Sequence, residues 1–418
     1  MDTQVERVVL KHMRENWGNA SSVHEVGRRA RKVIEDSRKA VARVLGVKSE
    51  EIIFTGSGTE SANLAIFGVA RAALGYRGRP LVVVYKKYGK HIITSKIEHP
   101  AVLRACQYLE KNEGFKVTYV GVDKNGIVNP DDVAKALRPD TILVSIMYAN
   151  NEIGTIQPIA EIAKIIHDFR NCKPITNNQQ STTSQNEKLP LFHSDSCQAA
   201  GVLNLNVNQL GVDLMTLNGS KIYGPKGTGC LFIRRGINLV PLIFGGSQER
   251  GLRAGTENPA LIAGFAKALE LADENKKKES VRLIKLRDYV IEQILKKIPD
   301  SQLNGDPIKR LPNNMNISFK NIDGEMLMLA LDQKGIQVST GSACTSTPSN
   351  SSFGTPALRD LTGSTSTEPP HVMQAIKNPK GWGNIRITLG RQTKKDDLDY
   401  FLRLLAGEVK RLRKIITK

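Results

Sequence analysis

The chain has 418 residues, 40% of them hydrophobic and 24% charged. This balance is typical of a soluble globular protein long enough to form more than one domain. No apolar run reaches the length of a membrane span, and the first residues lack the apolar core of a signal peptide, so we expect no membrane segment and a cytoplasmic location. Lysine and arginine number 60 against 41 acidic residues, a net charge of +19.

Five scattered cysteines form no C-x-x-C pair, which argues against a disulfide framework or a zinc site and for a reducing compartment. The excess positive charge has two interpretations, a nucleic-acid-binding surface and a solvated lysine-rich surface. Aromatic residues make up only 5% of the chain, which leaves little material for base stacking. We therefore favour the solvated lysine-rich surface and expect no direct nucleic-acid contact. Such a charge can also steer an acidic protein partner.

From residue 51 onwards, short runs rich in β-forming residues alternate with helical patterns. The expected strands cover 51–56, 91–97, 116–122, 141–149 and 189–194, and the expected helices cover 60–74, 101–111 and 159–169. This alternation predicts an α/β domain whose mostly parallel sheet is covered on both faces. Ligands of such a domain gather at the carboxyl ends of the strands.

The pattern changes after about residue 262. The later elements are expected to be a long charged helix over 267–298, a strand over 315–319, a helix over 325–335, a strand over 336–340 and a closing helix from about 395. We therefore predict two domains, a large α/β domain over 1–262 and a smaller α+β domain over 263–418. Polar segments at about 171–188 and 341–368 are too long for ordinary connections and predict an insertion and a mobile loop.

The stretch LNGSKIYGPKGTGCLF, residues 217–232, puts two lysines in a glycine-rich turn between apolar runs. Ser220 precedes Lys221 and Pro225 precedes Lys226, so the order does not match a nucleotide P-loop, and the glycines do not match a dinucleotide fingerprint. Two interpretations remain: a surface turn with incidental lysines, or a loop that presents Lys221 as a nucleophile.

Two other strand ends supply partners for Lys221. Residues 56–59 lead from a strand straight into a helix, where free backbone N–H groups and the helix dipole form an anion site. Asp195 follows an apolar strand, a position in which an isolated aspartate is usually a helix cap. Pyridoxal phosphate needs a lysine for its Schiff base, a carboxylate that keeps the pyridine nitrogen protonated, and an anion site for its phosphate. Together these three features predict a pyridoxal-phosphate site.

The chain also resembles a known family. Eight segments follow in the order seen in NifS/IscS-type cysteine desulfurases: FTGSGTES, ITSKIEHPAV, ANNEIGTIQPI, HSDSCQAAG, GSKIYGPKGTG, QERGLRAGTEN, STGSACTS and NIRITLGR. These enzymes belong to the class V aminotransferase family and have the type I fold of pyridoxal-phosphate enzymes. The resemblance runs from about residue 17 to the end and implies a large cofactor-binding domain followed by a small C-terminal domain.

By this resemblance, Lys221 carries the cofactor and removes the α-proton of the substrate, Asp195 pairs with the pyridine nitrogen, and His99 stacks on the ring and moves protons. Outside such a motif, a histidine like His99 is more often a helix-terminal or core residue. The other implied contacts are Gln198 and Asn151 at the phenolic oxygen, Gly58, Thr59, Asn218 and Ser220 at the phosphate, Thr256 at the phosphate of the other subunit of a homodimer, and Arg386 with Asn19 at the substrate carboxylate.

Cys344 separates this family from related aminotransferases. It lies in the polar stretch GSACTSTPSNSS, whereas cysteines that pack in cores have apolar neighbours, so its setting suggests reactivity. The resemblance implies that Cys344 takes the sulfur of L-cysteine as a persulfide, that L-alanine leaves, and that the sulfur passes to an iron–sulfur scaffold or a tRNA-thiolation relay. It implies no resident metal, with Cys344 at most a transient iron–sulfur ligand.

Two features depart from the family pattern. Ser220 stands where the family usually has a histidine, and we expect it to bind the cofactor less firmly. The strand and Ala-Thr-Thr-Pro turn that normally precede the WGNASS segment are missing, so we expect either an upstream start or an active site without part of its wall. The alternative functions are a selenocysteine lyase, an aminotransferase, which Cys344 disfavours, and a non-catalytic protein that retains the fold.

Overall fold

The computed structural model describes residues 1–75, 89–172, 189–341 and 370–416. The chain divides into two compact units. The first unit comprises 1–121, 128–149 and 157–277, and the second comprises 122–127, 150–156 and 278–418. No helix among the described residues is long and apolar enough to cross a membrane.

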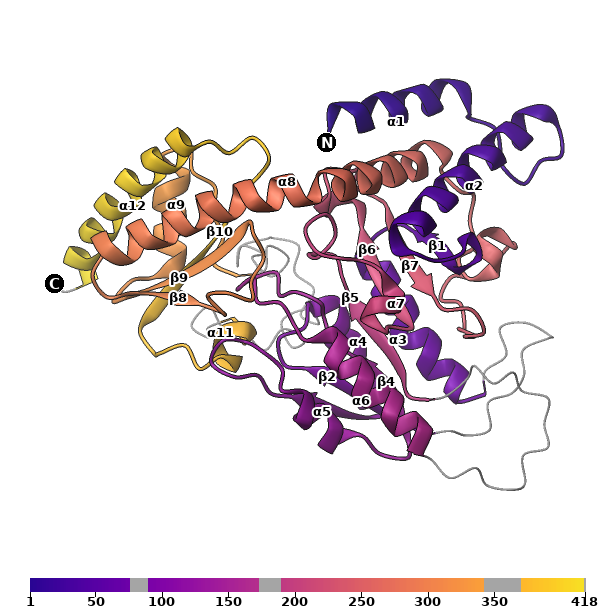
Figure 1. Ribbon diagram of the computed structural model, residues 1–418, viewed down its shortest axis with the longest axis horizontal. Helices are drawn as coiled ribbons and strands as arrows, with labels where there is room; N and C mark the ends of the chain where they lie inside the picture. Colours follow the sequence, from indigo (N-terminus) through magenta and orange to yellow (C-terminus); the bar gives the residue numbers. More distant parts are fainter. Residues whose placement is uncertain (76–88, 173–188, 342–369, 417–418) are drawn as a thin grey trace, which may run out of the picture. The chain divides into compact units, whose positions relative to one another are not determined.

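The first unit is built on a seven-stranded sheet (Figure 1). Its strands are β1 (Ile52–Thr55), β2 (His91–Ser95), β3 (Lys116–Val120), β4 (Thr141–Ser145), β5 (Leu191–Asp195), β6 (Leu214–Asn218) and β7 (Gly229–Ile233). Its helices are α1 (Thr3–Glu15), α2 (Glu25–Leu45), α3 (Gly58–Ala73), α4 (Pro100–Asn112), α5 (Pro130–Ala136), α6 (Ile159–Cys172) and α7 (Val207–Leu210), with short 3-10 turns η1 (Ser49–Glu51), η2 (Gly219–Lys221) and η3 (Gln248–Gly251). Helix α8 (Pro259–Lys297) begins in this unit and ends in the second.

The strand order is β1-β7-β6-β5-β4-β2-β3, and only β7 runs antiparallel to its neighbours. Most of these strands are buried along their whole length because helices such as α3 and α4 pack on the sheet, which explains their continuous apolar sequences. Since all strands but β7 point the same way, the carboxyl ends of β1, β6, β5 and β2 lie at one edge of the sheet. The residues that follow these four ends form the candidate site.

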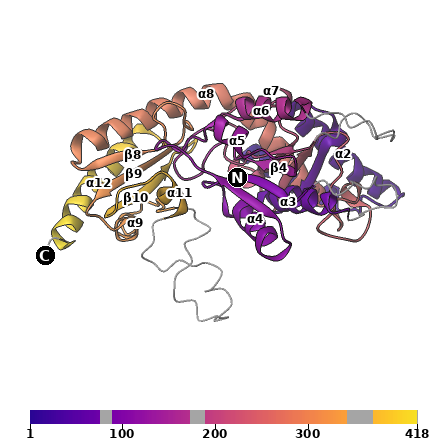
Figure 2. The same cartoon turned by 90° about the horizontal axis from the view of Figure 1, so that it is seen from below.

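The second unit contains an antiparallel sheet of β10 (Trp382–Thr388), β9 (Asn314–Lys320) and β8 (Ser301–Asn304). Its helices are α9 (Gly324–Asp332), α11 (His371–Ala375) and α12 (Lys395–Ile416), and Figure 2 shows α12 and α9 beside the strands. The core of this unit joins apolar side chains of the second half of α8, of β9 and β10, and of α12.

The predicted mixed α/β fold with a mostly parallel sheet is confirmed. The predicted strand over 336–340 is wrong: this segment pairs with β10 only at Ser339, which bridges Arg386, while Ile336 and Val338 pack as half-buried side chains against the core. The predicted boundary at residue 262 falls inside α8, and the domain limits stay a prediction. Of the two predicted polar segments, 173–188 and 342–368 lie outside the described residues.

Candidate active site

The turn between β1 and α3 presents the free amides of a helix start. Ser57 caps this helix, because its Oγ accepts a hydrogen bond from the N–H of Glu60 at 3.1 Å. Gly58 is buried, and a Cβ at this position would lie 2.7 Å from Sγ of Cys197 and 3.2 Å from Cβ of Asn218. A glycine is therefore required for the start of α3 to come this close to the ends of β5 and β6. Thr59 is exposed on the same turn.

Asp195 is the last residue of β5 and is 7% exposed. Its Oδ1 accepts a hydrogen bond from the N–H of Cys197 at 3.0 Å, and the residues that follow form a turn, so Asp195 is not the helix cap that an isolated aspartate usually is. Its negative charge acts on two neighbouring groups. It raises the pKa of His99, against the lowering effect of burial, and it raises the pKa of Cys197 together with burial. Gln198 is half-buried in the turn that follows.

Lys221 ends η2, directly after β6, and its side chain is exposed. The turn is held by Asn218, whose Oδ1 accepts hydrogen bonds from the N–H of Ser220 at 3.1 Å and from its Oγ at 3.2 Å. The ammonium group of Lys221 helps to lower the pKa of His99 and opposes the raising of the pKa of Cys197. Lys221 therefore lies within electrostatic reach of the ends of both β2 and β5.

His99 is the N-cap of α4, with Pro100 in the first helical position. Its Nδ1 accepts a hydrogen bond from the N–H of Ala101 at 3.1 Å, so the proton of the neutral ring is on Nε2. Burial lowers the pKa of His99, and the charge of Lys221 acts in the same direction while Asp195 opposes it. The ring is therefore a neutral group that offers one N–H donor.

The second unit contains two of the predicted residues, Asn151 and Arg386, in direct contact. Nη1 of Arg386, on β10, donates to the backbone carbonyl of Asn151 at 3.3 Å, and Nδ2 of Asn314 donates to the same carbonyl at 3.3 Å. The neighbouring Glu152 is 1% exposed; burial raises its pKa to about 7, against the opposing effect of Arg386. The guanidinium of Arg386 is thus held by a hydrogen bond and acts electrostatically on the buried carboxyl group of Glu152.

Two predicted residues among those that the structure describes have no hydrogen bond to these groups, and a third is not described. Asn19 is exposed between α1 and α2, where its Oδ1 accepts a hydrogen bond from the N–H of Ser21 at 2.9 Å. Thr256 is exposed between η3 and α8. Cys344 lies outside the described residues. The roles of these three residues stay predictions.

Sequence reasoning missed Glu98, which precedes His99 and is fully buried. Its Oε1 accepts hydrogen bonds from Oγ of Ser95 at 2.7 Å and from the N–H of Met147 at 2.8 Å. Burial raises the pKa of Glu98 to about 8, and the charge of Asp195 acts in the same direction. The available signal was an acidic residue between the apolar Ile97 and a helix start.

The donor set of the first unit fits pyridoxal phosphate. This cofactor needs a lysine, a carboxylate and an anion site, and the first unit has all three. The lysine is Lys221, the carboxylate is Asp195 at the end of β5, and the anion site is the start of α3, where the neighbours of Gly58 leave no room for a side chain. The neutral ring of His99 and the amide and hydroxyl groups of Asn218 and Ser220 add polar groups without another carboxylate.

Comparisons with known proteins identify the family of the chain. The family model described as aminotransferase class-V matches residues 2–401. The chain is 46% identical over 414 residues to a cysteine desulfurase IscS of Dictyoglomus turgidum, covering 99% of this chain and 92% of that protein. It is 43% identical to a cysteine desulfurase IscS of Methanosarcina thermophila, covering 98% and 89%. A solved NifS-like protein is similar with a TM-score of 0.81 and 33% identity, covering 98% and 96% of the two chains. The chain therefore belongs to the aminotransferase class-V family.

Proposed function

We propose that this protein is a pyridoxal-phosphate-dependent cysteine desulfurase, which converts L-cysteine to L-alanine and keeps the sulfur as a persulfide. Relatives that share 46% and 43% identity over nearly the whole chain are named cysteine desulfurases. The main structural support is that Lys221 and Asp195 act with opposite charge on the same imidazole, His99, at strand ends that meet the start of α3.

The residues of the first unit divide the work on the cofactor. When bound, pyridoxal phosphate supplies an electrophilic carbon for the substrate amine and a ring that accepts the electrons released at the α-carbon. Lys221 attaches the cofactor and later takes the α-proton. Asp195 holds a proton on the ring nitrogen. The amides of Gly58 and Thr59, with Asn218 and Ser220, bind the phosphate.

His99 contributes a neutral imidazole whose Nδ1 is engaged by the N–H of Ala101 and whose Nε2–H remains the donor. Because burial lowers its pKa, the ring adds no positive charge that would compete with Lys221 for Asp195. Gln198 and Asn151 are assigned to the phenolic oxygen. Arg386 is assigned to the substrate carboxylate, a partner suited to its planar pair of N–H groups, together with Asn19.

Sulfur transfer is assigned to Cys344. Its thiolate attacks the sulfur of the substrate, so that a sulfur–sulfur bond forms while the carbon–sulfur bond breaks. The bonding electron pair stays with the carbon skeleton, which takes up a proton and leaves as L-alanine. The persulfide then gives its terminal sulfur to an acceptor thiol or, with a reductant, releases it as sulfide.

The finer assignments concern partners and location. We assign a homodimer, in which Thr256 contributes to the phosphate site of the other subunit, and an acceptor that is an iron–sulfur scaffold or a sulfur-relay protein, both on the family resemblance. We assign a cytoplasmic location. Its support is that Cys106, Cys172, Cys197 and Cys230 are all free thiols, as expected in a reducing compartment.

The decisive assay supplies the protein with pyridoxal phosphate, L-cysteine and a reducing thiol, and measures sulfide, alanine and pyruvate. A desulfurase forms sulfide and alanine in equal amounts. Pyruvate with sulfide would indicate a β-eliminating lyase, and a keto acid that retains its sulfur would indicate an aminotransferase. Activity on L-selenocysteine alone would indicate a selenocysteine lyase.

A further inference from the structure

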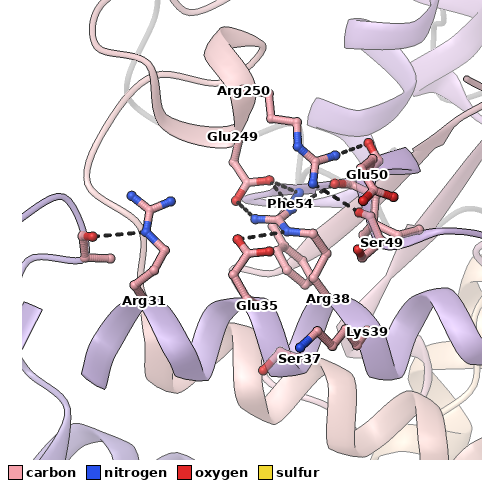
Figure 3. Close-up of polar contacts among 12 residues, drawn as sticks. Arg31, Glu35, Ser37, Arg38, Lys39, Ser49, Glu50, Phe54, Glu249 and Arg250 are labelled. Atoms are coloured by element: carbon pink, nitrogen blue, oxygen red, sulfur yellow. Dashed lines mark hydrogen bonds and ion pairs between the residues drawn. The ribbon is translucent and has the colours of Figure 1, made fainter. Parts of the chain in front are cut away.

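Two residues far apart in sequence cover the open edge of β1. Among the described strands, β1 is the first in the sheet order and pairs only with β7. On its other side, Nη1 of Arg38 donates to the carbonyl of Ile52 at 2.7 Å, and the N–H of Phe54 donates to Oε2 of Glu249 at 2.8 Å. These side chains take the hydrogen bonds that a neighbouring strand would otherwise make (Figure 3).

Arg38 and Glu249 also bind each other in a buried two-pronged ion pair. Nη1 and Nη2 of Arg38 donate to Oε2 and Oε1 of Glu249, both at 2.8 Å, and the two side chains are 3% and 2% exposed. The guanidinium lies 4.9 Å from the ring centre of Phe54 and also contacts Glu35 at 3.4 Å. Each charge therefore has several partners, as a buried ion pair requires.

The backbone around Glu249 is held in an unfavourable conformation. Glu249 and Arg250 both adopt left-handed φ angles, 45° and 58°, which residues with side chains rarely take. Such a backbone persists where its surroundings fix it. Arg250 supplies one such contact, donating to the carbonyls of Ser49 and Glu50 just before β1 (Figure 3).

The same segment reaches the turn after β1. Nε of Arg253 donates to Oε1 of Glu60 at 3.0 Å, and Oε2 of Glu60 accepts a hydrogen bond from the N–H of Gly56 at 2.8 Å. Residues 249–253 thus bind β1 at Phe54 directly and bind the turn at Gly56 through Glu60. The two contacts lie directly before the amides at the start of α3.

We propose that Arg38 and Glu249 are positioning residues for the phosphate of the cofactor. The pair makes hydrogen bonds to the edge of β1 in place of a neighbouring strand. These bonds fix the end of β1 and thereby orient the amides of Gly58 and Thr59. The inference rests on the proposed function, since it assumes that these amides bind the phosphate of pyridoxal phosphate. It adds a role for two residues that do not touch the cofactor themselves.

The test compares two ligands on the cofactor-free protein. Pyridoxal phosphate and pyridoxal, which lacks the phosphate, are titrated by absorbance, and the ratio of their dissociation constants measures the phosphate contribution. In Arg38→Met/Glu249→Met, both buried charges are removed together, so no lone charge is left in the core. We expect this ratio to fall about tenfold or more, the loss of one or two charge-assisted hydrogen bonds, while the pyridoxal constant stays nearly unchanged.

The surface pair of Arg43 on α2 and Glu270 on α8 provides the control, because it has the same residue types with the arginine 77% exposed. Arg43→Met/Glu270→Met should leave the ratio unchanged. Arg38→Lys keeps the charge and the fold but loses the two-pronged geometry, and we expect an intermediate fall. If the double Met variant does not fold, Arg38→Lys is the variant that tests the inference.

An unchanged ratio in folded Arg38→Met/Glu249→Met, or in Arg38→Lys where the double variant does not fold, would overturn the inference and leave the proposed function intact. If the wild-type protein does not prefer pyridoxal phosphate to pyridoxal, the proposed function itself is wrong. The two failures are distinguished because the wild type and the variant prefer pyridoxal phosphate equally in the first, whereas the wild type itself shows no preference in the second.

Discussion

Gly58 and Cys197 meet where the start of α3 approaches the end of β5: a Cβ on Gly58 would lie 2.7 Å from Sγ of Cys197. Asp195 holds the backbone of this cysteine, since the N–H of Cys197 donates to Oδ1 of the carboxylate. Burial raises the pKa of Cys197, with Asp195 acting in the same direction, so the group is a neutral packing element. The contact between Gly58 and Sγ of Cys197 therefore limits how closely the proposed phosphate site approaches Asp195.

Gly58→Ala should displace the start of α3 and weaken pyridoxal-phosphate binding about tenfold or more, because the added methyl group overlaps Cys197. Cys197→Ala in the same chain should recover most of the affinity. The measurement is a double-mutant cycle of cofactor dissociation constants. Gly407→Ala, in open space on α12, serves as the control and should stabilise the protein slightly. Equal losses with and without Cys197 would contradict this explanation.

Lys221→Ala should abolish the absorption band of protein-bound cofactor, because Lys221 is the lysine whose charge reaches both His99 and Cys197. Lys226 is exposed in the turn beyond it, and Lys226→Ala should remain yellow. The check is the visible spectrum of each purified variant after cofactor is added and excess removed. A colourless Lys226→Ala beside a yellow Lys221→Ala would transfer the role to Lys226.

The buried Glu98 should make stability depend on pH. Its pKa in the folded protein is raised to about 8 by burial, so the folded state binds the proton more tightly than the unfolded state. The stabilising contribution is complete below the unfolded pKa, near 4.5, and is lost as the pH rises through 8. Glu98→Gln, which cannot ionise, should therefore gain melting temperature relative to wild type between pH 5 and pH 9.

The control for this prediction is Glu274→Gln, an exposed glutamate on α8. Its melting temperature should follow that of wild type at both pH values. If Glu98→Gln also follows wild type, the carboxyl group does not change its ionisation in this range.

Arg386→Lys should raise KM for L-cysteine about tenfold or more with a smaller change in kcat, because a lysine lacks the two parallel N–H groups that suit a carboxylate. The spectrum of the bound cofactor should be unaffected. A kcat loss with unchanged KM would argue that Arg386 acts mainly through the carbonyl of Asn151, to which it donates at 3.3 Å.

The sequence predicted the strands that end at the candidate site and the turns that follow them, because that information is local. The apolar runs that end at Thr55 and Asp195, and the glycine-rich turn at Lys221, are continuous stretches whose burial and turn formation follow from their own residues. The strand predicted over 336–340 failed because alternation of apolar residues requires a half-buried segment but does not supply a partner for its backbone.

Long-range features were beyond sequence reasoning. Arg38 and Glu249 are separated by 211 residues, and each resembles a surface residue on an amphipathic helix or a polar loop. Glu98 and Glu152 are visible in the sequence only as acidic residues within motifs. Their burial depends on how other elements pack around them. The antiparallel placement of β7 between β1 and β6 is also set by the packing of the sheet and not by the composition of the strand.

The most direct test of the account is the reaction of Cys344→Ser with L-cysteine. Cofactor binding is assigned to residues other than Cys344, so this variant should stay yellow and change its spectrum when L-cysteine is added. A hydroxyl group cannot take sulfur as a persulfide, so alanine and sulfide should be almost absent, whereas wild type forms both in equal amounts. Release of alanine by Cys344→Ser at the wild-type rate would contradict the desulfurase mechanism.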